Sequence, residues 1–272
     1  MDQVERDRWI QDYYAKQFSE ADRLVTRSAN GQLEFVRVQQ LVSARLDRHS
    51  RVLDVGGGTG VHAQWLAGTG HTVCMVDPVP EQVAIANRVS SQIQALVGDA
   101  RDLQFDDESF DAVLLLGPLY HLQERGDRVR AWQEALRVLT PGGIVFGAGI
   151  SRAAAALKMV FARSFRDIPA EALIDLLENG SDSKQAPTTG FPGGHHHTAV
   201  ELAGEATDAG FENVVTVGIE GPAGLGLEML APTKALVSAG NVIADAAQSA
   251  PPIADLSPHL MSIGTKPLNT TS

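Results

Sequence analysis

The chain has 272 residues, of which 44% are hydrophobic and 20% are charged, and it contains 26 glycines and 13 prolines. This composition is typical of a folded protein with a full core and excludes disordered and collagen-like chains. The formal net charge of -11, without a run of Lys or Arg, argues against nucleic acid and anionic membranes as partners. Cys74 is the only cysteine, so the chain forms neither an internal disulfide nor a thiolate cluster for a metal.

The N-terminal part of the chain has the pattern of helices. Residues 2 to 46 contain no proline, and apolar side chains recur at helical spacing at Phe35, Val38, Val42 and Leu46. We expect two helices there, separated at Gly31. The first residues lack the apolar stretch of a signal peptide, and no apolar run reaches the roughly 18 residues of a membrane-spanning helix. These features predict a cytoplasmic protein and leave its oligomeric state open.

From residue 51 to residue 150, short apolar strands alternate with helices. The expected strands are residues 51–55, 71–76, 94–97, 110–116 and 144–149, and the sequence Thr-Pro-Gly-Gly at 140–143 is expected to form a turn. Helices are expected at 63–67, 81–89 and 129–139. This alternation predicts an α/β fold with a mostly parallel, Rossmann-like sheet and helices on both faces.

After residue 150 the alternation stops and later resumes. Two helical stretches (152–163 and 169–178) precede a loop rich in Gly, Pro and Ser at 179–194, which we expect to be a mobile cover. Thr198 and Glu201 form a capping-box pattern that opens another helix. Further elements are expected at 211–220, 232–248 and 259–265, giving seven strands in all. The expected division is an N-terminal helical cap (1–48), an α/β domain (49–150 and 198–266), a helical lid insertion (151–197) and a tail (267–272).

A glycine-rich turn follows the first expected strand. Gly56, Gly58 and Gly60 let the backbone turn tightly and approach a ligand at the start of the next helix. A dinucleotide fingerprint that starts at Gly58 is satisfied only in its relaxed form, with Ala63 in the third position. Asp54, two residues before the first glycine, would repel a pyrophosphate. It favours a ligand amine or an ordered water.

The pattern D-x-G-x-G-x-G after a strand resembles motif I of the class I S-adenosylmethionine-dependent methyltransferases. Matching stretches follow in the same order: Asp77 after the second strand, Gly98-Asp99-Ala100, FDAVLLLGPLYHL and LRVLTPGG. The resemblance is strong over residues 50–150 and weak over 198–265, and the topology most resembles the ubiquinone/menaquinone-biosynthesis type of small-molecule methyltransferase. It implies that Asp77 binds the ribose and Asp99 the adenine amino group. The cofactor-binding residues that we expect are Asp54, Gly56, Gly58, Gly60, Asp77, Pro78, Asp99, Ala100 and Leu116.

The implied reaction moves the methyl group of S-adenosylmethionine to an O, N or C atom of a small molecule. A secondary metabolite and the carboxylate of a modified peptide are both candidate acceptors. Tyr120 and His121 follow the fourth strand, at the edge where open α/β sheets bind ligands. We expect His121 to act as general base and Tyr120 to orient the acceptor, although His121 is equally compatible with a packed loop residue. A carboxylate acceptor would need no base.

Three adjacent histidines, His195, His196 and His197, end the Gly-rich loop. No carboxylate or cysteine partner is evident for them, so we expect no metal site. His196 and His197, together with Tyr14, are expected to line the acceptor pocket, with helix core as the other reading of Tyr14. Two rival functions remain from the residues alone: an NAD(P)-dependent oxidoreductase that uses the glycine spacing, and a non-catalytic cofactor-binding partner protein.

Overall fold

The computed structural model describes residues 3–16, 22–161, 170–180, 193–248, 250 and 253–269. Most of the expected loop at 179–194 and the first residue of the helix expected at 169–178 lie outside these ranges. None of the helices within them combines the length and apolarity that crossing a lipid bilayer requires.

The expected seven-stranded, mostly parallel sheet is confirmed. The strands lie in the order β3-β2-β1-β4-β5-β7-β6. The first five run parallel, and β7 pairs antiparallel with both β5 and β6. Their bounds are Arg51–Val55 (β1), Thr72–Asp77 (β2), Ile93–Val97 (β3), Phe110–Leu115 (β4), Leu139–Ile150 (β5), Glu212–Gly218 (β6) and His259–Thr265 (β7).

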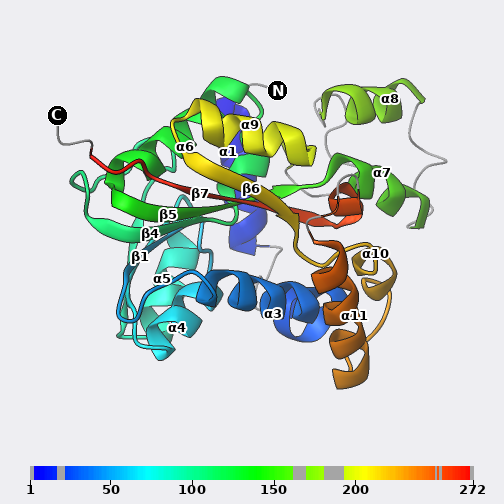
Figure 1. Ribbon diagram of the computed structural model, residues 1–272, viewed down its shortest axis with the longest axis horizontal. Coiled ribbons are helices and arrows are strands. Elements are labelled where there is room, and N and C mark those ends of the chain that lie inside the picture. The colour runs from blue at the N-terminus through cyan, green and yellow to red at the C-terminus, as the bar shows by residue number, and fades with distance from the viewer. Residues whose placement is uncertain are drawn as a thin grey trace.

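Helices cover both faces of the sheet (Figure 1). One face carries α3 (Ala29–Ser43), α4 (Val61–Gly68) and α5 (Pro80–Val89), and the other carries α6 (Arg125–Val138) and α9 (Ala199–Asp208). Side chains of β1 alternate between two buried clusters, because successive strand residues point to opposite faces: Leu53 packs on the side of α6 and α9, whereas Val52 packs on the side of α3 and α4. The remaining helices are α1 (Gln3–Lys16), α7 (Arg152–Phe161), α8 (Ala170–Asn179), α10 (Gly224–Leu227) and α11 (Lys234–Ala247), with short turns η1 (Arg23–Arg27), η2 (Pro118–Tyr120) and η4 (Ile253–Leu256).

The break that we expected at Gly31 is wrong. Ser28 is the N-cap of α3, and its hydroxyl oxygen accepts a hydrogen bond from the N–H of Gly31, so Gly31 lies in the first turn of the helix. A Cβ on Gly31 would lie only 1.9 Å from the carbonyl oxygen of Arg23 in η1. Glycine at this position therefore allows α3 to pack closely against η1, and it does not separate two helices.

The turn that we expected at 140–143 is part of strand β5. Phe110 of β4 pairs with Leu139, whereas Ala112 pairs with Ile144, so the four residues 140–143 lie opposite the single residue Asp111 and bulge from the ladder. Gly142 has φ +79°, and its N–H donates to the carbonyl oxygen of Lys266 at 3.0 Å. The segment turns as expected, but its backbone bonds to the chain after β7 keep it in the sheet.

The segment between β5 and α9 begins and ends at the same place, beside the end of β5. Ser151 and His197 form an isolated parallel bridge, and the Arg152 guanidinium donates to both carboxylate oxygens of Glu201 in α9, at 2.7 and 2.6 Å. The helices α7 and α8 of this segment lie at one end of the sheet, far from α4 and α5 (Figure 1). Residues 151 and 197 thus lie beside each other at the end of β5.

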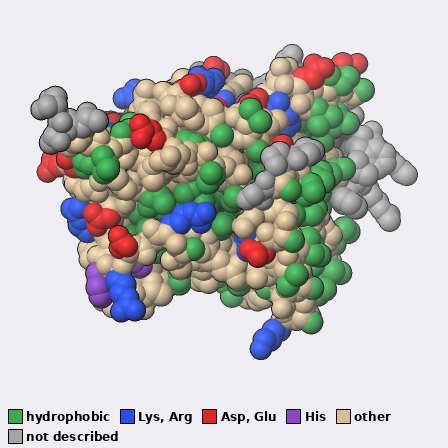
Figure 2. Space-filling view, viewed as in Figure 1, with side chains coloured by type: hydrophobic (Ala, Val, Ile, Leu, Met, Phe, Trp, Pro, Cys, Tyr) green, Lys and Arg blue, Asp and Glu red, His purple; other side chains and the backbone are tan. Residues whose placement is uncertain are grey.

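Acidic and basic side chains are scattered over the face of the molecule that Figure 2 shows, and many basic groups lie next to acidic ones. Among the ion pairs of the protein are Arg51 with Asp111 (2.8 Å) and Arg137 with Asp107 (2.8 Å). On this face the positive charges do not gather into a patch of the kind that binds a polyphosphate.

Candidate functional site

A cavity lies along the edge of the sheet where the parallel strands end. This is the edge at which open α/β sheets bind ligands, because the loops after several strands meet there. The cavity brings together most of the site residues that the sequence predicts: Tyr14, Asp54, Gly56, Gly58, Asp77, Pro78, Asp99, Ala100, Leu116, Tyr120 and His121. In the described part of the chain, Gly60, His196 and His197 are not among its lining residues.

The glycine loop between β1 and α4 forms one wall of the cavity. Gly56, Gly58 and Gly60 all have positive φ angles, of +75°, +56° and +81°. The N–H of Gly58 donates to Oδ2 of Asp77 at 2.8 Å, which ties the loop to the end of β2. A Cβ on Gly57 would lie 2.7 Å from Oδ2 of Asp54. The loop thus presents bare backbone to the cavity and to the Asp54 carboxylate.

Two buried carboxylates face this loop. Asp54 is 1% exposed, and its Oδ2 has no hydrogen-bond partner within the described ranges. Burial, reinforced by the nearby charge of Asp77, raises the pKa of Asp54 to about 7. Burial also raises the pKa of Asp77 to about 6, against the hydrogen bonds from the N–H groups of Val79 and Gly58. Two acids in this state form a site for a cation, which would relieve both desolvation and mutual repulsion.

S-adenosylmethionine fits this donor set. It carries an ammonium group and a sulfonium group, so it supplies the positive charge that Asp54 and Asp77 lack, and its ribose hydroxyls are donors for a carboxylate. A dinucleotide pyrophosphate would place negative charge against two acids. The clearest feature of this fit is Oδ2 of Asp54, which has no hydrogen-bond partner among the described residues.

Arg101 is a residue of the cavity that the sequence analysis missed. Its guanidinium bonds Asp99 at 2.5 Å, Asp7 of α1 at 2.9 Å and Asp127 at 3.3 Å. Burial opposes the ionisation of Asp99, but the hydrogen bonds from Arg101 lower its pKa. The carboxylate expected to receive the adenine is therefore already shared with an arginine, and this arginine also links α1 to the loop after β3.

Helix α1 places Tyr14 against the loop that follows β4. The Tyr14 hydroxyl lies 3.1 Å from Nε2 of His121, and the two rings meet edge to face with centroids 5.5 Å apart. The ring of Tyr120 also packs against His121, at a centroid distance of 4.7 Å. The two residues expected to act on the acceptor thus lie in one aromatic group with Tyr14, and Tyr14 occupies the ring nitrogen that a general base would use.

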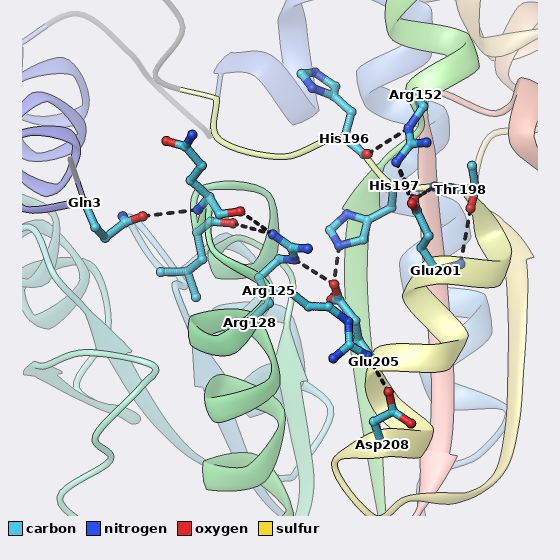
Figure 3. A network of polar contacts seen from close by, with 12 residues as sticks. Gln3, Arg125, Arg128, Arg152, His196, His197, Thr198, Glu201, Glu205 and Asp208 are labelled. Carbon is cyan, nitrogen blue, oxygen red and sulfur yellow. Dashed lines mark hydrogen bonds and ion pairs between the residues drawn. The ribbon is translucent and has the colours of Figure 1, made fainter. Parts of the chain in front are cut away.

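His196 and His197 lie in a different buried network (Figure 3). Nε2 of His197 lies 3.3 Å from Oε2 of Glu205, whose Oε1 accepts from Nε of Arg128 at 2.8 Å, and Arg152 donates to the carbonyl oxygen of His196. Burial lowers the pKa of His196 to about 4. The inference that these histidines have no carboxylate partner is wrong: α9 starts immediately after them and brings Glu205 back to His197.

The same cavity has a polar region that the sequence analysis did not anticipate. Its lining includes Arg23 of η1, Glu34 of α3, His62 of α4 and His259 of β7. These residues are far apart in the chain and carry no local motif. They come from η1, α3, α4 and β7, and only the tertiary fold brings them to one cavity.

Comparisons with known proteins agree with this geometry. Residues 53–147 match a family model described as a methyltransferase domain. An uncharacterized methyltransferase of Mycobacterium tuberculosis is 41% identical over 93 residues, which are 34% of this chain and 37% of that protein. The ubiquinone biosynthesis O-methyltransferase of Xanthomonas oryzae pv. oryzae is 34% identical over 146 residues, covering 52% of this chain and 57% of that protein. A solved S-adenosylmethionine-dependent methyltransferase from Methanosarcina mazei superposes with a TM-score of 0.58 at 23% identity, covering 84% of this chain and 98% of that one.

The chain thus spans 37% and 57% of the lengths of these two sequence relatives. The matched residues 53–147 run from β1 into β5 and contain the glycine loop, Asp77 and Asp99. The structural likeness shows the same fold over most of the chain. Residues 53–147 are therefore similar to a methyltransferase domain, and most of the chain has the fold of a solved S-adenosylmethionine-dependent methyltransferase.

Proposed function

We propose that the protein is a methyltransferase that acts on an O, N or C atom of a small molecule held in the cavity beside the glycine loop. The observation that carries the proposal is the buried Oδ2 of Asp54, which lies next to bare glycine backbone and lacks a hydrogen-bond partner in the part of the chain that the structure describes. When bound, S-adenosylmethionine supplies a methyl group that bonds to the acceptor atom while the carbon–sulfur bond breaks and its electron pair stays on sulfur. A peptide carboxylate belongs to the wider set of acceptors that this chemistry allows.

The residues of the cavity act in this proposal by binding and orientation. Asp54 holds the amine of the cofactor, Asp77 holds its ribose, and the group of Tyr14 and His121 closes the cavity from the side of α1. Holding two reactants in a near-attack geometry contributes on the order of 7–11 kcal/mol to lowering a barrier. No covalent intermediate on the protein is needed.

Calorimetric titration with S-adenosylhomocysteine tests the proposal. We expect one site per chain, and we expect Asp54→Asn to weaken binding about 10- to 100-fold, because a hydrogen bond to a charged group contributes about 1.5–3 kcal/mol. Asp111→Asn is the matched control, since Asp111 is exposed and pairs with Arg51 outside the cavity. The control should bind as the wild type does.

Two results would contradict the proposal. Equal affinity in Asp54→Asn and wild type would show that the glycine loop is not part of the cofactor site. No binding of S-adenosylhomocysteine by a folded wild-type protein would remove the methyltransferase function itself.

A further inference from the structure

The polar end of the cavity lies on the side of β7. His259, the first residue of β7, pairs with Ile150 at the end of β5, so it lies at the same sheet edge as the glycine loop. The strands β1, β4, β5 and β7 are neighbours in that order. Three strand spacings of ~4.8 Å separate β1 from β7, about 14 Å in all. An acceptor in the cavity would therefore lie between the glycine loop and His259.

A buried carboxylate holds the His259 ring from behind. Oε1 of Glu220 lies 2.5 Å from Nδ1 of His259, and Oε2 accepts from the backbone N–H of His259 at 3.0 Å. Glu220 is 0% exposed and does not line the cavity, whereas His259 does. Glu220 thus lies outside the cavity lining, whereas His259 and Glu34, whose carboxylate also approaches Nδ1, are part of it.

Ser257 fixes the carboxylate in this position. Its hydroxyl donates to Oε2 of Glu220 at 2.9 Å and accepts from the backbone N–H groups of Glu220 and Gly221, both at 3.0 Å. The Glu220 side chain therefore has little freedom to turn away. A carboxylate on Nδ1 selects the tautomer in which Nδ1 carries the proton and Nε2 has a free lone pair, and it stabilises the imidazolium once Nε2 accepts a proton.

The charges around His259 favour proton uptake. Glu34 lies 3.4 Å from Nδ1 of His259 and forms a two-pronged ion pair with Arg23, with contacts of 2.5 and 2.7 Å. Burial lowers the pKa of His259, but Glu34 and Glu220 outweigh this effect and the opposing charge of Arg23, so the pKa is raised above 6.5. With neutral His259, the two carboxylates and one guanidinium carry a net charge of -1, which one added proton neutralises. His62 on α4 also lines this end of the cavity, and its charge helps to lower the pKa of Glu34.

We propose that His259 is the proton acceptor of the methyl transfer and that the acceptor is a hydroxyl or an amine, which must lose a proton, rather than a carboxylate. This inference rests on the proposed methyltransferase function. The bond between the acceptor heteroatom and hydrogen breaks, its electron pair stays on the heteroatom, and the proton moves to Nε2 of His259 and later to solvent. An already ionised carboxylate has no proton to give, and the negative charge of the site repels it.

His259 also differs from His121 in what its ring offers. Nε2 of His121 lies 3.1 Å from the Tyr14 hydroxyl, whereas the carboxylate contacts of His259 are made through Nδ1. The His259 side chain is 19% exposed. We therefore assign a positioning role to His121 and the role of proton acceptor to His259.

The tautomer of His259 gives a test that does not depend on turnover. In two-bond ¹⁵N–¹H spectra of histidine-labelled protein, the signals absent from His259→Asn belong to His259. We expect a neutral form protonated on Nδ1 and a pKa above 6.5. In Glu220→Gln the amide would donate to Nδ1, so the proton should move to Nε2. A wild-type His259 that is protonated on Nε2 in its neutral form would overturn the proposal.

The acceptor class is tested with methyl-tritiated S-adenosylmethionine and a panel in which each carbon skeleton is present as the hydroxyl compound, the amine and the carboxylic acid. We expect methylation of the hydroxyl or the amine members, and which of the two is methylated identifies the acceptor group. We expect the methylation rate to fall about 10²-fold or more in His259→Asn. Asparagine keeps a donor for Glu220 but has no group that takes the proton. His49→Asn is the matched control, because His49 lies outside the cavity and has φ +63°, which asparagine tolerates.

The outcomes separate this inference from the function on which it rests. Turnover confined to carboxylic acids, or an undiminished rate in His259→Asn, would overturn the inference while binding of S-adenosylhomocysteine upholds the methyltransferase. Loss of that binding in the wild type would instead overturn the proposed function. If no panel member is methylated, the tautomer of His259 decides. We expect S-adenosylhomocysteine affinity in His259→Asn to stay within about twofold of wild type, so a large change would reveal damage to the cofactor end.

Discussion

The burial of Asp54 favours binding of a positively charged ligand and does not stabilise the free protein. It is 1% exposed, its pKa is raised to about 7, and one of its oxygens lacks a partner in the described chain. An acid in such a place destabilises the fold when it ionises, because its charge is desolvated and uncompensated. The same features make it a strong partner for an ammonium group.

The affinity for S-adenosylhomocysteine should depend on pH through this residue. The free carboxyl of Asp54 titrates near pH 7, whereas the ammonium group of the ligand favours the ionised form. Binding at lower pH must expel a proton, so affinity should fall about tenfold from pH 8 to pH 6. Calorimetry across this range measures the slope, and Asp54→Asn should flatten it. An equal affinity at pH 8 and pH 6 in the wild type would show that Asp54 does not bind the amine.

The contact between Tyr14 and His121 gives a second prediction at this scale. Tyr14→Phe keeps the ring but removes the hydroxyl that lies 3.1 Å from Nε2 of His121. We expect kcat/KM for the acceptor to fall roughly tenfold, the size of one net hydrogen bond, with cofactor affinity unchanged. Tyr13→Phe is the control, because Tyr13 is not among the residues that line the cavity. A loss confined to cofactor affinity would place Tyr14 on the cofactor rather than on the acceptor side.

Among the elements, those with local signals were predicted correctly. The capping box of Thr198 and Glu201 forms as expected, and the final strand at 259–265 is found at its predicted bounds. Local signals suffice there because the cap and the alternation lie within a few residues of one another. Gly31 and residues 140–143 were misread because their partners, Arg23 and Lys266, are brought to them by tertiary packing.

The close approach at Gly31 predicts an asymmetric effect of two glycine substitutions. Gly31→Ala would place a Cβ 1.9 Å from a backbone oxygen, so η1 must shift, and we expect a loss of about 1–3 kcal/mol in the free energy of unfolding. Gly204→Ala in α9 meets nothing within 4 Å and should stabilise the protein by about 0.5–1 kcal/mol, since alanine favours helix. Urea unfolding of both variants measures the difference. A neutral Gly31→Ala would mean that glycine is not required there.

Across the whole molecule, the glycine-loop end of the cavity was predictable and the end beside His259 was not. Asp54 and Asp77 lie at the carboxyl ends of β1 and β2, and Asp99 comes two residues after β3. Because parallel strands end at one edge, the meeting of these residues follows from the fold class. Glu34 and His259 come from opposite ends of the chain and meet only through the packing of α3 near β7. The histidine run at 195–197 illustrates the reverse case, because a conspicuous local cluster lies away from the cavity lining.

The central claim is that the cavity at the sheet edge binds S-adenosylmethionine rather than a dinucleotide. The most direct measurement is a side-by-side calorimetric titration of the wild-type protein with S-adenosylhomocysteine and with NAD⁺ at pH 8, where the Asp54 carboxylate is mostly ionised. We expect saturable binding of S-adenosylhomocysteine at one site per chain and no measurable heat from NAD⁺. Saturable binding of NAD⁺ with none of S-adenosylhomocysteine would contradict it.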